Sequence, residues 1–363
     1  LETFVDAAPK MLDLLRSRGF LEVEVFEGFP DYRPETPGSV QQGRSVEPRV
    51  FAGRRLGQEL AYLRRRAALA PGGLVGTMSE LRRMAAIRSN PAIFVRALPA
   101  LLRNLWNKLS GASHLATGGA LVAWLRHGMQ SLNIPLWLNS PLQELVLEDG
   151  AVVGAIVAKE GANMRVAARR GVLVAAGGFE HNLALRQQYF GADATTRYSS
   201  GSPGNTGDGV QAGVQAGAAT DLMDDAWWAP TFMPAGGAPQ IVIFERGKPG
   251  NIIVNTAGER FANEALPYNE LVKQMQEADQ SGPSAIPAFM IFDDTYRSRY
   301  PLGALLPGVT PEKYIESGFI TRCATVAELA QQMGIDAAGL QATVARFNAM
   351  AARGVDEDYQ RGE

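Results

Sequence analysis

The sequence has one cysteine, Cys323, among its 363 residues, so no disulfide can form within the chain. Three histidines are present, and their separations match none of the usual spacings of metal ligands; they are His114, His127 and His181. No run of about 18 uncharged apolar residues occurs, which argues against a transmembrane helix. These absences predict a protein of a reducing, cytoplasmic compartment that holds no metal.

Neither sign of charge dominates, because 35 Lys and Arg face 37 Asp and Glu for a net charge of -2. A chain with this balance has no overall attraction to polyanions, so we expect no nucleic-acid partner. The first twenty residues carry acids among the apolar positions and lack the basic start of an export signal. The chain begins at Leu1 and ends in GVDEDYQRGE, and we expect both ends to be cuts.

The length and the 46% hydrophobic share are sufficient for two domains with substantial cores. Apolar residues at helical spacing predict a helix over residues 4–18, and the alternation in LEVEVFEGF predicts a strand after it. Proline and glycine are dense in the segment that follows, up to Pro48, which predicts a long ordered loop. Such loops are often functional, and an exposed connector is the alternative.

From Gly57 to Leu109 the sequence is helical in character and basic, and Pro99 is expected to kink or interrupt it. Its apolar residues share one face, which is compatible with a helix lying on a membrane surface. A helical insert that packs its apolar face on the body of the protein is the simpler interpretation, since soluble helices show the same stripe.

The centre of the chain predicts short strands separated by turns. They are IPLWL, LQELVLE, AVVGAIVAK and MRVAARRGVLVAA, with a hairpin turn at Glu148-Asp149-Gly150. The run GVLVAA has no polar alternation and is typical of a strand covered on both faces of a parallel sheet. It ends at Gly177-Gly178 before a predicted helix over 180–189, whose N-terminal dipole would favour an anion.

A second glycine-rich turn, SGSPGNTGDGVQAG, leads into a helix that Thr206 or Asp208 would cap. Two such turns are typical of a nucleotide-binding α/β domain. After Asp225 the sequence becomes richer in aromatics and proline, which predicts a second domain. Its expected elements are the strands IVIFERG and NIIVN and helices over 265–277 and 326–353.

Three segments resemble the flavoproteins that include fumarate reductase, succinate dehydrogenase and 3-ketosteroid Δ1-dehydrogenase. They are VLVAAGGFEHN, NTGDGVQAGVQAGA and NIIVNTAGERFANE, in this order. The resemblance implies an α/β fold with a Rossmann-like FAD-binding domain over 1–228, its first βαβ unit missing, with a helical insert at about 64–110. An α+β catalytic domain would cover 229–363. The family's G-x-G-x-x-G fingerprint and C-terminal segment are absent from the sequence, so we expect a truncated chain.

The resemblance also implies cofactor and substrate residues. FAD would bind in an extended pose with its adenine beside the backbone of Leu145 and Val146. The remaining cofactor contacts would be Ala176, Gly177, Gly178, Thr206, Gly207 and Asp208. The family's paired tyrosines and its aromatic substrate walls would be Tyr32, Tyr268, Phe29 and Phe244.

The residues after GERFANE decide the substrate within this superfamily. Fumarate reductases carry there an arginine that delivers a proton, whereas this chain continues Ala265-Leu266-Pro267-Tyr268. The segment GFPDYRPETPG resembles the loop of the 3-ketosteroid Δ1-dehydrogenases, with a departure at Arg33, where members often have a second tyrosine. The resemblance therefore favours dehydrogenation of a 3-ketosteroid or a similar cyclic ketone. A fumarate-reductase-like enzyme acting on a small acid and a non-catalytic flavoprotein remnant are the alternatives.

Forming a double bond beside a ketone removes one proton and one hydride. No side chain accepts a hydride, so the flavin N5 would take it, and an external electron acceptor would reoxidise the cofactor. A free phenol has a pKa of about 10 and needs a neighbouring hydroxyl, dipole or positive charge to act as a base. We expect Tyr268 to be that base and Tyr32 to hydrogen-bond to it. Aromatic residues suited to an apolar slot are Phe29, Phe244, Trp227 and Trp228.

Overall fold

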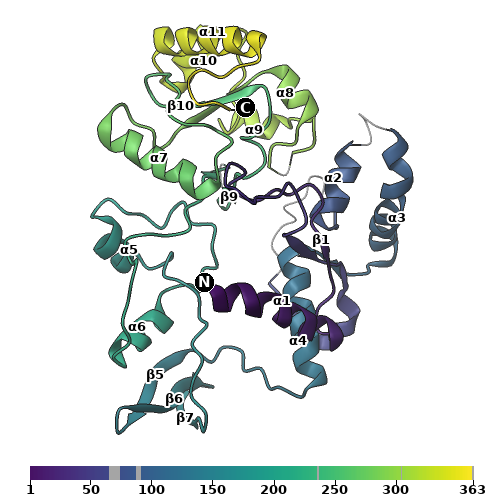
Figure 1. Cartoon of the computed structure of the whole chain (residues 1–363), viewed down its shortest axis with the longest axis vertical. Helices are drawn as coiled ribbons and strands as arrows, with labels where there is room; N and C mark the ends of the chain where they lie inside the picture. Colours follow the sequence, from purple (N-terminus) through teal and green to yellow (C-terminus); the bar gives the residue numbers. More distant parts are fainter. Residues whose placement is uncertain (65–73, 87–90, 235–236, 304, 362–363) are drawn as a thin grey trace. The chain divides into compact units, whose positions relative to one another are not determined.

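Figure 1 shows the computed structural model of the chain. The structure describes residues 1–64, 74–86, 91–234, 237–303 and 305–361. Internal contacts divide the chain into two compact units. Unit 1 comprises Leu1–Leu136 with Pro301–Leu306, and unit 2 comprises Trp137–Tyr300 with Pro307–Glu363. The sequence divides the chain at residue 228 into an FAD-binding and a catalytic domain. That division is by function, and it stays a prediction.

Unit 1 is mainly helical. Its helices are α1 (Glu2–Ser17), η1 (Gly53–Tyr62), α2 (Met78–Ala86), η3 (Pro91–Ile93), α3 (Phe94–Ser110) and α4 (Thr117–Ser131). Two short antiparallel pairs join β1 (Val23–Val25) to β2 (Val46–Pro48) and β3 (Phe51–Ala52) to β4 (His114–Leu115). The core contains Phe51, which is fully buried, and the Trp124 ring, whose centroid lies 5.0 Å from that of Phe51. The predicted N-terminal helix and the strand after it are confirmed.

The predicted helical stretch from Gly57 to Leu109 is broken into separate pieces where the structure describes it. Residues 74–77 between η1 and α2 are not helical. The predicted residues 65–73 and 87–90 lie outside the described residues. Pro99 lies inside α3 and does not interrupt it.

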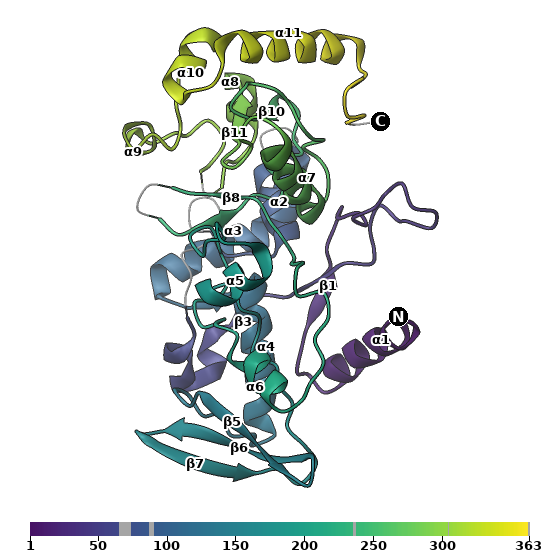
Figure 2. The same ribbon diagram turned by 90° about the vertical axis from the view of Figure 1, so that its left-hand side faces the viewer.

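Unit 2 begins with an antiparallel sheet in the order β5-β6-β7, formed by Leu142–Glu148, Ala151–Lys159 and Ala162–Ala167 (Figure 2). Asp149 and Gly150 connect the first two strands with φ values of 50° and 78°, as a tight hairpin requires. The strands LQELVLE and AVVGAIVAK are confirmed. The run IPLWL was predicted as a strand and is not one, since its backbone pairs with no described strand.

The predicted buried strand GVLVAA is also wrong. The residues 171–176 form no strand, and Leu173 is 92% exposed. Among the described residues every strand pair is antiparallel, so the expected parallel sheet is not observed. An apolar sequence marks side chains suited to burial, but a strand also needs neighbours that complete its backbone hydrogen bonds.

The rest of unit 2 contains helices and two short two-stranded sheets. The helices are α5 (Leu183–Phe190), α6 (Asp208–Gln215), α7 (Tyr268–Ser281), α8 (Asp294–Arg299), α9 (Glu312–Glu316), α10 (Val326–Met333) and α11 (Ala337–Arg353). The strands are β8 (Thr231–Phe232), β9 (Gln240–Ile241), β10 (Asn251–Val254) and β11 (Phe289–Phe292). β8 pairs with β9 and β10 with β11, both antiparallel.

The strand β10 supplies both sides of the core of this region because successive side chains alternate across a strand. Ile252 and Val254 pack with α10 and α11, which lie side by side in Figure 1. Ile253 packs on the other side against Leu271 of α7. The strand NIIVN is confirmed, whereas IVIFERG is a strand only at Ile241. The helix predicted over 326–353 is divided at Gly334, which ends α10 with φ 69°.

No helix within the described ranges is long and apolar enough to cross a membrane. The described His, Cys, Asp and Glu side chains form no group of three suited to a metal ion.

Candidate active site

The two glycine-rich turns of unit 2 lie against each other. The Gly207 N–H donates to the Gly178 carbonyl at 3.1 Å, and the His181 N–H donates to the Asn205 carbonyl at 3.1 Å. The Asn182 side-chain amide adds a bond of 2.8 Å to the Thr206 carbonyl. The structure therefore brings together the two turns that the sequence assigned to the cofactor.

Glycine is required where these turns approach most closely. Gly177 has φ 79°, and a Cβ there would lie 2.6 Å from Asn205 Oδ1. A Cβ on Gly209 would lie 2.7 Å from Val174 Cγ1. The Asn205 amide also donates to Glu180 Oε1 at 2.7 Å, which fixes the asparagine beside Gly177. A larger residue at either glycine would separate the turns.

The helix α6 begins differently from the prediction. Its N-cap is Gly207 in the left-handed region, and neither Thr206 nor Asp208 caps it. Asp208 is instead the first helical residue, where its charge is favourable for the helix dipole, and it accepts a bond of 3.0 Å from the Thr206 hydroxyl. The N-terminus of α5 is capped by Asn182, whose Oδ1 accepts from the Leu185 N–H at 3.0 Å.

The predicted adenine contacts lie on the neighbouring strand. Leu145 and Val146 of β5 pair with Ala155 and Gly154 of β6, and α6 lies beside β5. The predicted cofactor residues of the strand and of both turns therefore belong to one region of unit 2.

This region fits a flavin dinucleotide in its chemistry. Residues Ala176 to Gly178 of the first turn are exposed. Among the described residues, the Gly177 and Gly178 N–H groups donate to no protein acceptor. Exposed amide donors and glycines without side chains suit a planar ligand whose ring edge carries hydrogen-bond acceptors.

Tyr268 is the first residue of α7 and is half-buried. The turn that leads to it is held by Arg246, whose Nη1 donates to the Glu264 carbonyl at 2.6 Å and to the Leu266 carbonyl. The next turn of the helix is closed by a bond of 3.0 Å from the Leu271 N–H to the Pro267 carbonyl. The position of Tyr268 is thus set by the residues just before it.

Glu264 of this turn belongs to a buried network of charged side chains. The fully buried Glu264 accepts from Arg260 Nε at 2.9 Å and from Arg361 Nη1 at 2.9 Å. Arg260 also binds Asp356 through both oxygens, at 3.1 and 2.8 Å. Burial opposes ionisation of Asp356, yet the bonds from Arg260 outweigh it and lower its pKa to about 2. Burial lowers the pKa of Arg246 to about 10.

The second candidate tyrosine lies in the long loop of unit 1. The Tyr32 ring packs edge-on against Phe29, with ring centroids 5.8 Å apart, and Phe29 stacks on Phe26 at 4.7 Å. Asp31 closes the loop by accepting from the Val40 N–H at 3.0 Å and from Arg44 at 2.9 Å. The predicted ordered loop is confirmed between β1 and β2. Tyr32 itself is 52% exposed.

The predicted site residues are thus divided between the units. Tyr32 and Phe29 belong to unit 1, and Tyr268 and Phe244 belong to unit 2, so the pairing of the two tyrosines stays a prediction. Trp227 is 92% exposed, while Trp228 packs edge-on against Phe190 at 4.9 Å.

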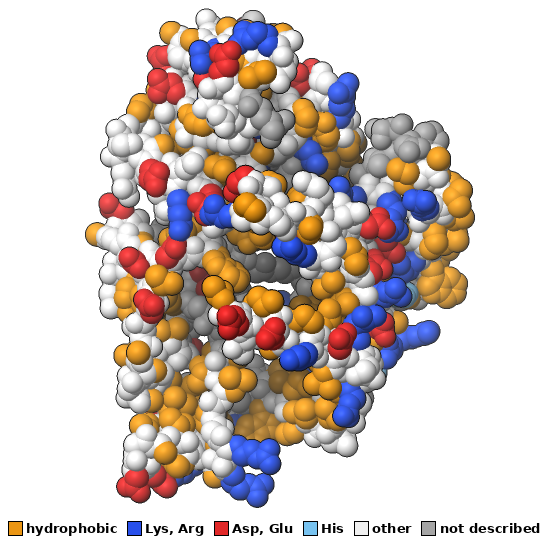
Figure 3. Space-filling view, in the orientation of Figure 1, with side chains coloured by type: hydrophobic (Ala, Val, Ile, Leu, Met, Phe, Trp, Pro, Cys, Tyr) orange, Lys and Arg blue, Asp and Glu red, His pale blue; other side chains and the backbone are white. Residues whose placement is uncertain are grey.

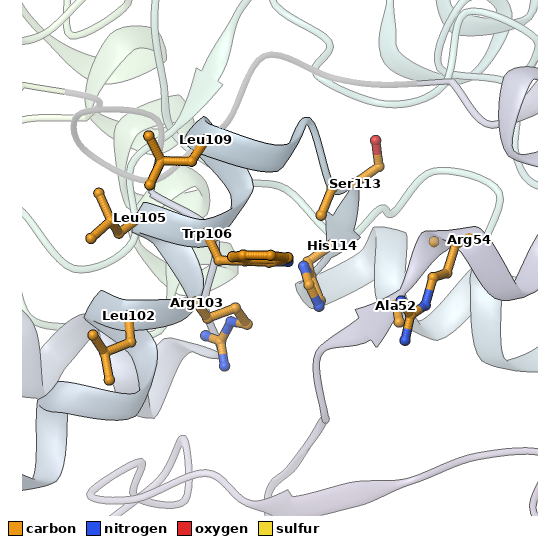
Figure 4. Close-up of a pocket in the computed structure, with 11 residues that line it drawn as sticks. Ala52, Arg54, Leu102, Arg103, Leu105, Trp106, Leu109, Ser113 and His114 are labelled. Carbon is orange, nitrogen blue, oxygen red and sulfur yellow. The ribbon is translucent and has the colours of Figure 1, made fainter.

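A cavity of about 630 Å³ opens on α3 in unit 1, and the sequence did not point to it. Figure 4 shows Leu102, Leu105 and Leu109 in a row along the helix, with Trp106 directed toward His114. Burial, with the positive charges of Arg103 and Arg54, lowers the pKa of His114. The residues that line the cavity are Ala52, Gly53, Arg54, Leu102, Arg103, Leu105, Trp106, Leu109, Ala112, Ser113 and His114. None of the predicted site residues is among them.

Sequence reasoning also missed the charges that hold the turn before Tyr268. The spacing of Arg260 and Glu264, four residues apart within GERFANE, was an available signal for a pair. Their partners Asp356 and Arg361 lie about a hundred residues away, and no local pattern connects them. Arg246 donates to backbone carbonyls, which no sequence pattern reveals.

Comparison with known proteins identifies relatives of this chain. A 3-oxosteroid 1-dehydrogenase of Mycolicibacterium smegmatis is 41% identical over 100% of this chain and 65% of its own length. A 4-oxocyclohexanecarboxylate 2-dehydrogenase of Sinomonas cyclohexanicum is 33% identical over 95% of this chain and 59% of its own length. The chain therefore spans slightly less than two thirds of these relatives.

The same similarity extends to three dimensions. The crystal structure of 3-ketosteroid delta1-dehydrogenase from Sterolibacterium denitrificans in complex with 1,4-androstadiene-3,17-dione matches with a TM-score of 0.91 and 34% identity. The match covers 99% of this chain and 67% of that chain. Residues 1–363 also match the family described as FAD binding domain. The chain belongs to this family of FAD-binding flavoproteins.

Proposed function

We propose that the protein to which this chain belongs is an FAD-dependent oxidoreductase that introduces a C1–C2 double bond into 3-ketosteroids. The observation that carries the proposal is the joint presence of the glycine turns and a tyrosine at the start of α7, in a chain 41% identical to a 3-oxosteroid 1-dehydrogenase. A relative named for a small oxocyclohexane acid supports the broader class of cyclic ketones.

Tyr268 takes the proton from the carbon next to the carbonyl. It is the first residue of α7, and the turn before it is held by Arg246. Tyr32 would be the hydrogen-bond partner of Tyr268, as the resemblance implies. The edge-on contact with Phe29 and the hydrogen bond from the Val40 N–H to Asp31 hold Tyr32 in the loop.

The remaining hydrogen leaves the next carbon as a hydride. FAD, when bound, supplies the hydride acceptor at N5. Leu145, Val146 and the residues of the two glycine turns would hold the cofactor, and Phe29 and Phe244 would be apolar walls for the ring system. An external electron acceptor must take up the two electrons to complete the balance.

A reductase of a small dicarboxylic acid is the alternative in the same superfamily. Such an enzyme needs cations for its substrate, whereas this chain places Tyr268 where the fumarate reductases carry an arginine. The aromatic pair Phe29 and Tyr32 is likewise suited to an apolar substrate.

The test uses the chain expressed with any sequence that flanks it in its gene. Androst-4-ene-3,17-dione is added without oxygen, and we expect the absorbance of the bound flavin to bleach, with no bleaching by succinate. Tyr268→Phe should lower the rate by about 10²-fold or more while the flavin absorbance persists. Tyr198→Phe is the control, since Tyr198 is a partly exposed tyrosine of the same unit. A normal rate for Tyr268→Phe would reject its role, and bleaching by succinate alone would reject the substrate class.

We also propose a peripheral membrane contact through α3. Seven large apolar side chains on one face of this helix are each at least 38% exposed: Phe94, Val95, Leu98, Leu102, Leu105, Trp106 and Leu109. The opposite face is buried through Ala97, Ala100 and Asn104. Asn104 pairs with both backbone groups of Val75, at 2.8 and 2.9 Å, which keeps the small residues inward and the apolar stripe outward. This arrangement differs from the packed insert that the sequence favoured.

The charge of the region suits an anionic lipid surface. Residues 64–110 contain nine Lys or Arg and one acidic residue, Glu80, although the whole chain has a net charge of -2. Figure 3 shows hydrophobic side chains gathered over α3 with Lys and Arg beside them. Exposed Arg96 and Lys108 flank the stripe. A helix with an aromatic and leucine-rich face and basic flanks binds in the headgroup region.

Flotation with vesicles tests this contact. We expect binding to vesicles that contain phosphatidylglycerol, weaker binding to pure phosphatidylcholine, and release at high salt. Leu105→Glu should abolish binding, and Leu132→Glu on the end of α4 should leave it unchanged, since the two leucines are 54% and 52% exposed. Equal behaviour of the two variants, or no binding by the unmodified protein, would reject the contact.

A further inference from the structure

Arg246 is an arginine with an unusual set of partners. Its side chain is 3% exposed, and its guanidinium donates to three backbone carbonyls. Nε binds the Val242 carbonyl at 3.2 Å, and Nη1 binds the carbonyls of Glu264 and Leu266. Burying a cation is unfavourable unless its hydrogen bonds are satisfied, so this residue must contribute something that an apolar residue cannot.

Its partners lie on two segments of the chain, one around Val242 and one around Glu264 and Leu266. Val242 and Arg246 bracket Phe244, which the proposed function assigns to the substrate wall. Glu264 and Leu266 form the turn that ends at Tyr268, the proposed base. The guanidinium is therefore a direct link between the backbone that carries the wall and the backbone that carries the base.

The same two segments are joined to one buried frame on their other side. Arg361 donates to the carbonyls of Arg246 and Lys248, at 3.3 and 2.5 Å, and to the Glu264 carboxylate at 2.9 Å. The Tyr296 hydroxyl donates to the Glu245 carbonyl at 2.9 Å. Arg361 therefore also joins the two segments, and Arg246 adds a second link through Val242 and Leu266, which are each two residues from Phe244 and Tyr268, respectively.

We propose that Arg246 is a positioning residue for the dehydrogenation, which sets the spacing between the Phe244 wall and the Tyr268 base through the carbonyls of Val242, Glu264 and Leu266. The inference rests on the proposed function, because it assumes that these two residues meet the substrate. An arginine is needed for this link, because its planar fork directs several donors at fixed angles, whereas lysine presents one flexible ammonium. Small misplacements of a base relative to its substrate lower the rate strongly.

Arg246→Lys and Arg246→Gln are compared in the flavin-loaded protein, with rates divided by the amount of bound flavin. We expect both to lower kcat for androst-4-ene-3,17-dione by tenfold or more. Lysine should not rescue the rate, although it keeps the charge. The matched control is Arg297→Gln, because Arg297 is also buried and donates to the carbonyls of Tyr300 and Val309, away from both segments. Its kcat per bound flavin should stay within threefold of the unmodified protein.

Amide hydrogen exchange supplies a readout that does not depend on turnover. In Arg246→Lys, the peptide covering 262–270 should exchange at least tenfold faster, while the peptide covering 337–353 in α11 should be unchanged. Faster exchange everywhere, or a loss of kcat equal to that of Arg297→Gln, would show a general structural role and overturn the proposal. If Arg246→Gln does not fold, Arg246→Lys alone decides the question.

Tyr268→Phe in the same assay separates the proposed function from the positioning role of Arg246. If it loses turnover while Arg246→Lys keeps both turnover and normal exchange, the positioning role fails and the proposed function stands. If Tyr268→Phe turns over normally, the proposed function fails, whatever Arg246→Lys does.

Discussion

Glu264 should be among the residues whose replacement most destabilises unit 2. Its carboxylate has no exposed surface and accepts four hydrogen bonds, from the Ile253 N–H, from two nitrogens of Arg260 and from Arg361. Glu264→Gln keeps the volume but replaces one acceptor oxygen with an NH2 group that faces cationic donors. Removing one partner of a buried ion pair leaves the other charge uncompensated, so we expect a loss of about 3–5 kcal/mol.

Urea unfolding followed by circular dichroism at neutral pH measures this loss. The control is Glu357→Gln, which removes an ion pair of 2.7 Å to Arg353 whose side chains are about half exposed, at 51% and 54%. Such a surface pair contributes only about 0.3–0.5 kcal/mol. If the two variants unfold at the same urea concentration, the buried network does not stabilise the protein as its geometry indicates.

Two further perturbations have effects that follow from the same contacts. The folded-state pKa of Asp356, about 2, is below the unfolded value of about 3.9, so its contribution of roughly 2–3 kcal/mol is present above about pH 4 and is lost as the pH falls through 2. The difference in stability between the unmodified protein and Asp356→Asn should therefore shrink in acid, and a constant difference would contradict the assignment. Gly258→Ala should destabilise more than Gly19→Ala, because both have positive φ but only at Gly258 would the Cβ meet a neighbour, at 2.4 Å from the Leu340 nitrogen; equal thermal midpoints would refute this.

Elements defined by local signals could be predicted from the sequence. The turn at Asp149-Gly150 needs positive φ at both residues, and its flanking strands are the observed β5 and β6. The helix over 326–353 was predicted in place, and only its division at Gly334 was missed. In such elements the determining interactions lie within a few residues of each other, so the local pattern contains them.

Elements that depend on distant partners could not be predicted in this way. GVLVAA has the composition of a covered strand, yet Leu173 is 92% exposed and no described strand pairs with it. The segment IPLWL was also predicted as a strand, and it too pairs with no described strand. Apolar periodicity reports which side chains favour burial, but the strands or helices that would cover them are specified elsewhere in the sequence.

The candidate site shows the same division between local and distant information. The two glycine turns were recognised because glycines are required where Gly177 meets Asn205 and where Gly209 meets Val174, and this need is visible in the sequence. The frame around Tyr268 was not visible, because Arg246 acts through backbone carbonyls and Arg260 through Asp356. Motif resemblance supplied Tyr268 as the proposed base, and the structure was needed to identify the residues that hold the turn before it.

The orientation of α3 could not follow from its apolar pattern, because the same stripe is expected of a packed helix and of a surface helix. Three buried positions decide between the two, and the most informative is Asn104. Its amide binds the Val75 backbone and the Ala100 carbonyl, so turning the leucines inward would carry Asn104 away from Val75 and break both bonds between them. The polar residue therefore orients the helix, and the apolar face turns outward as a consequence.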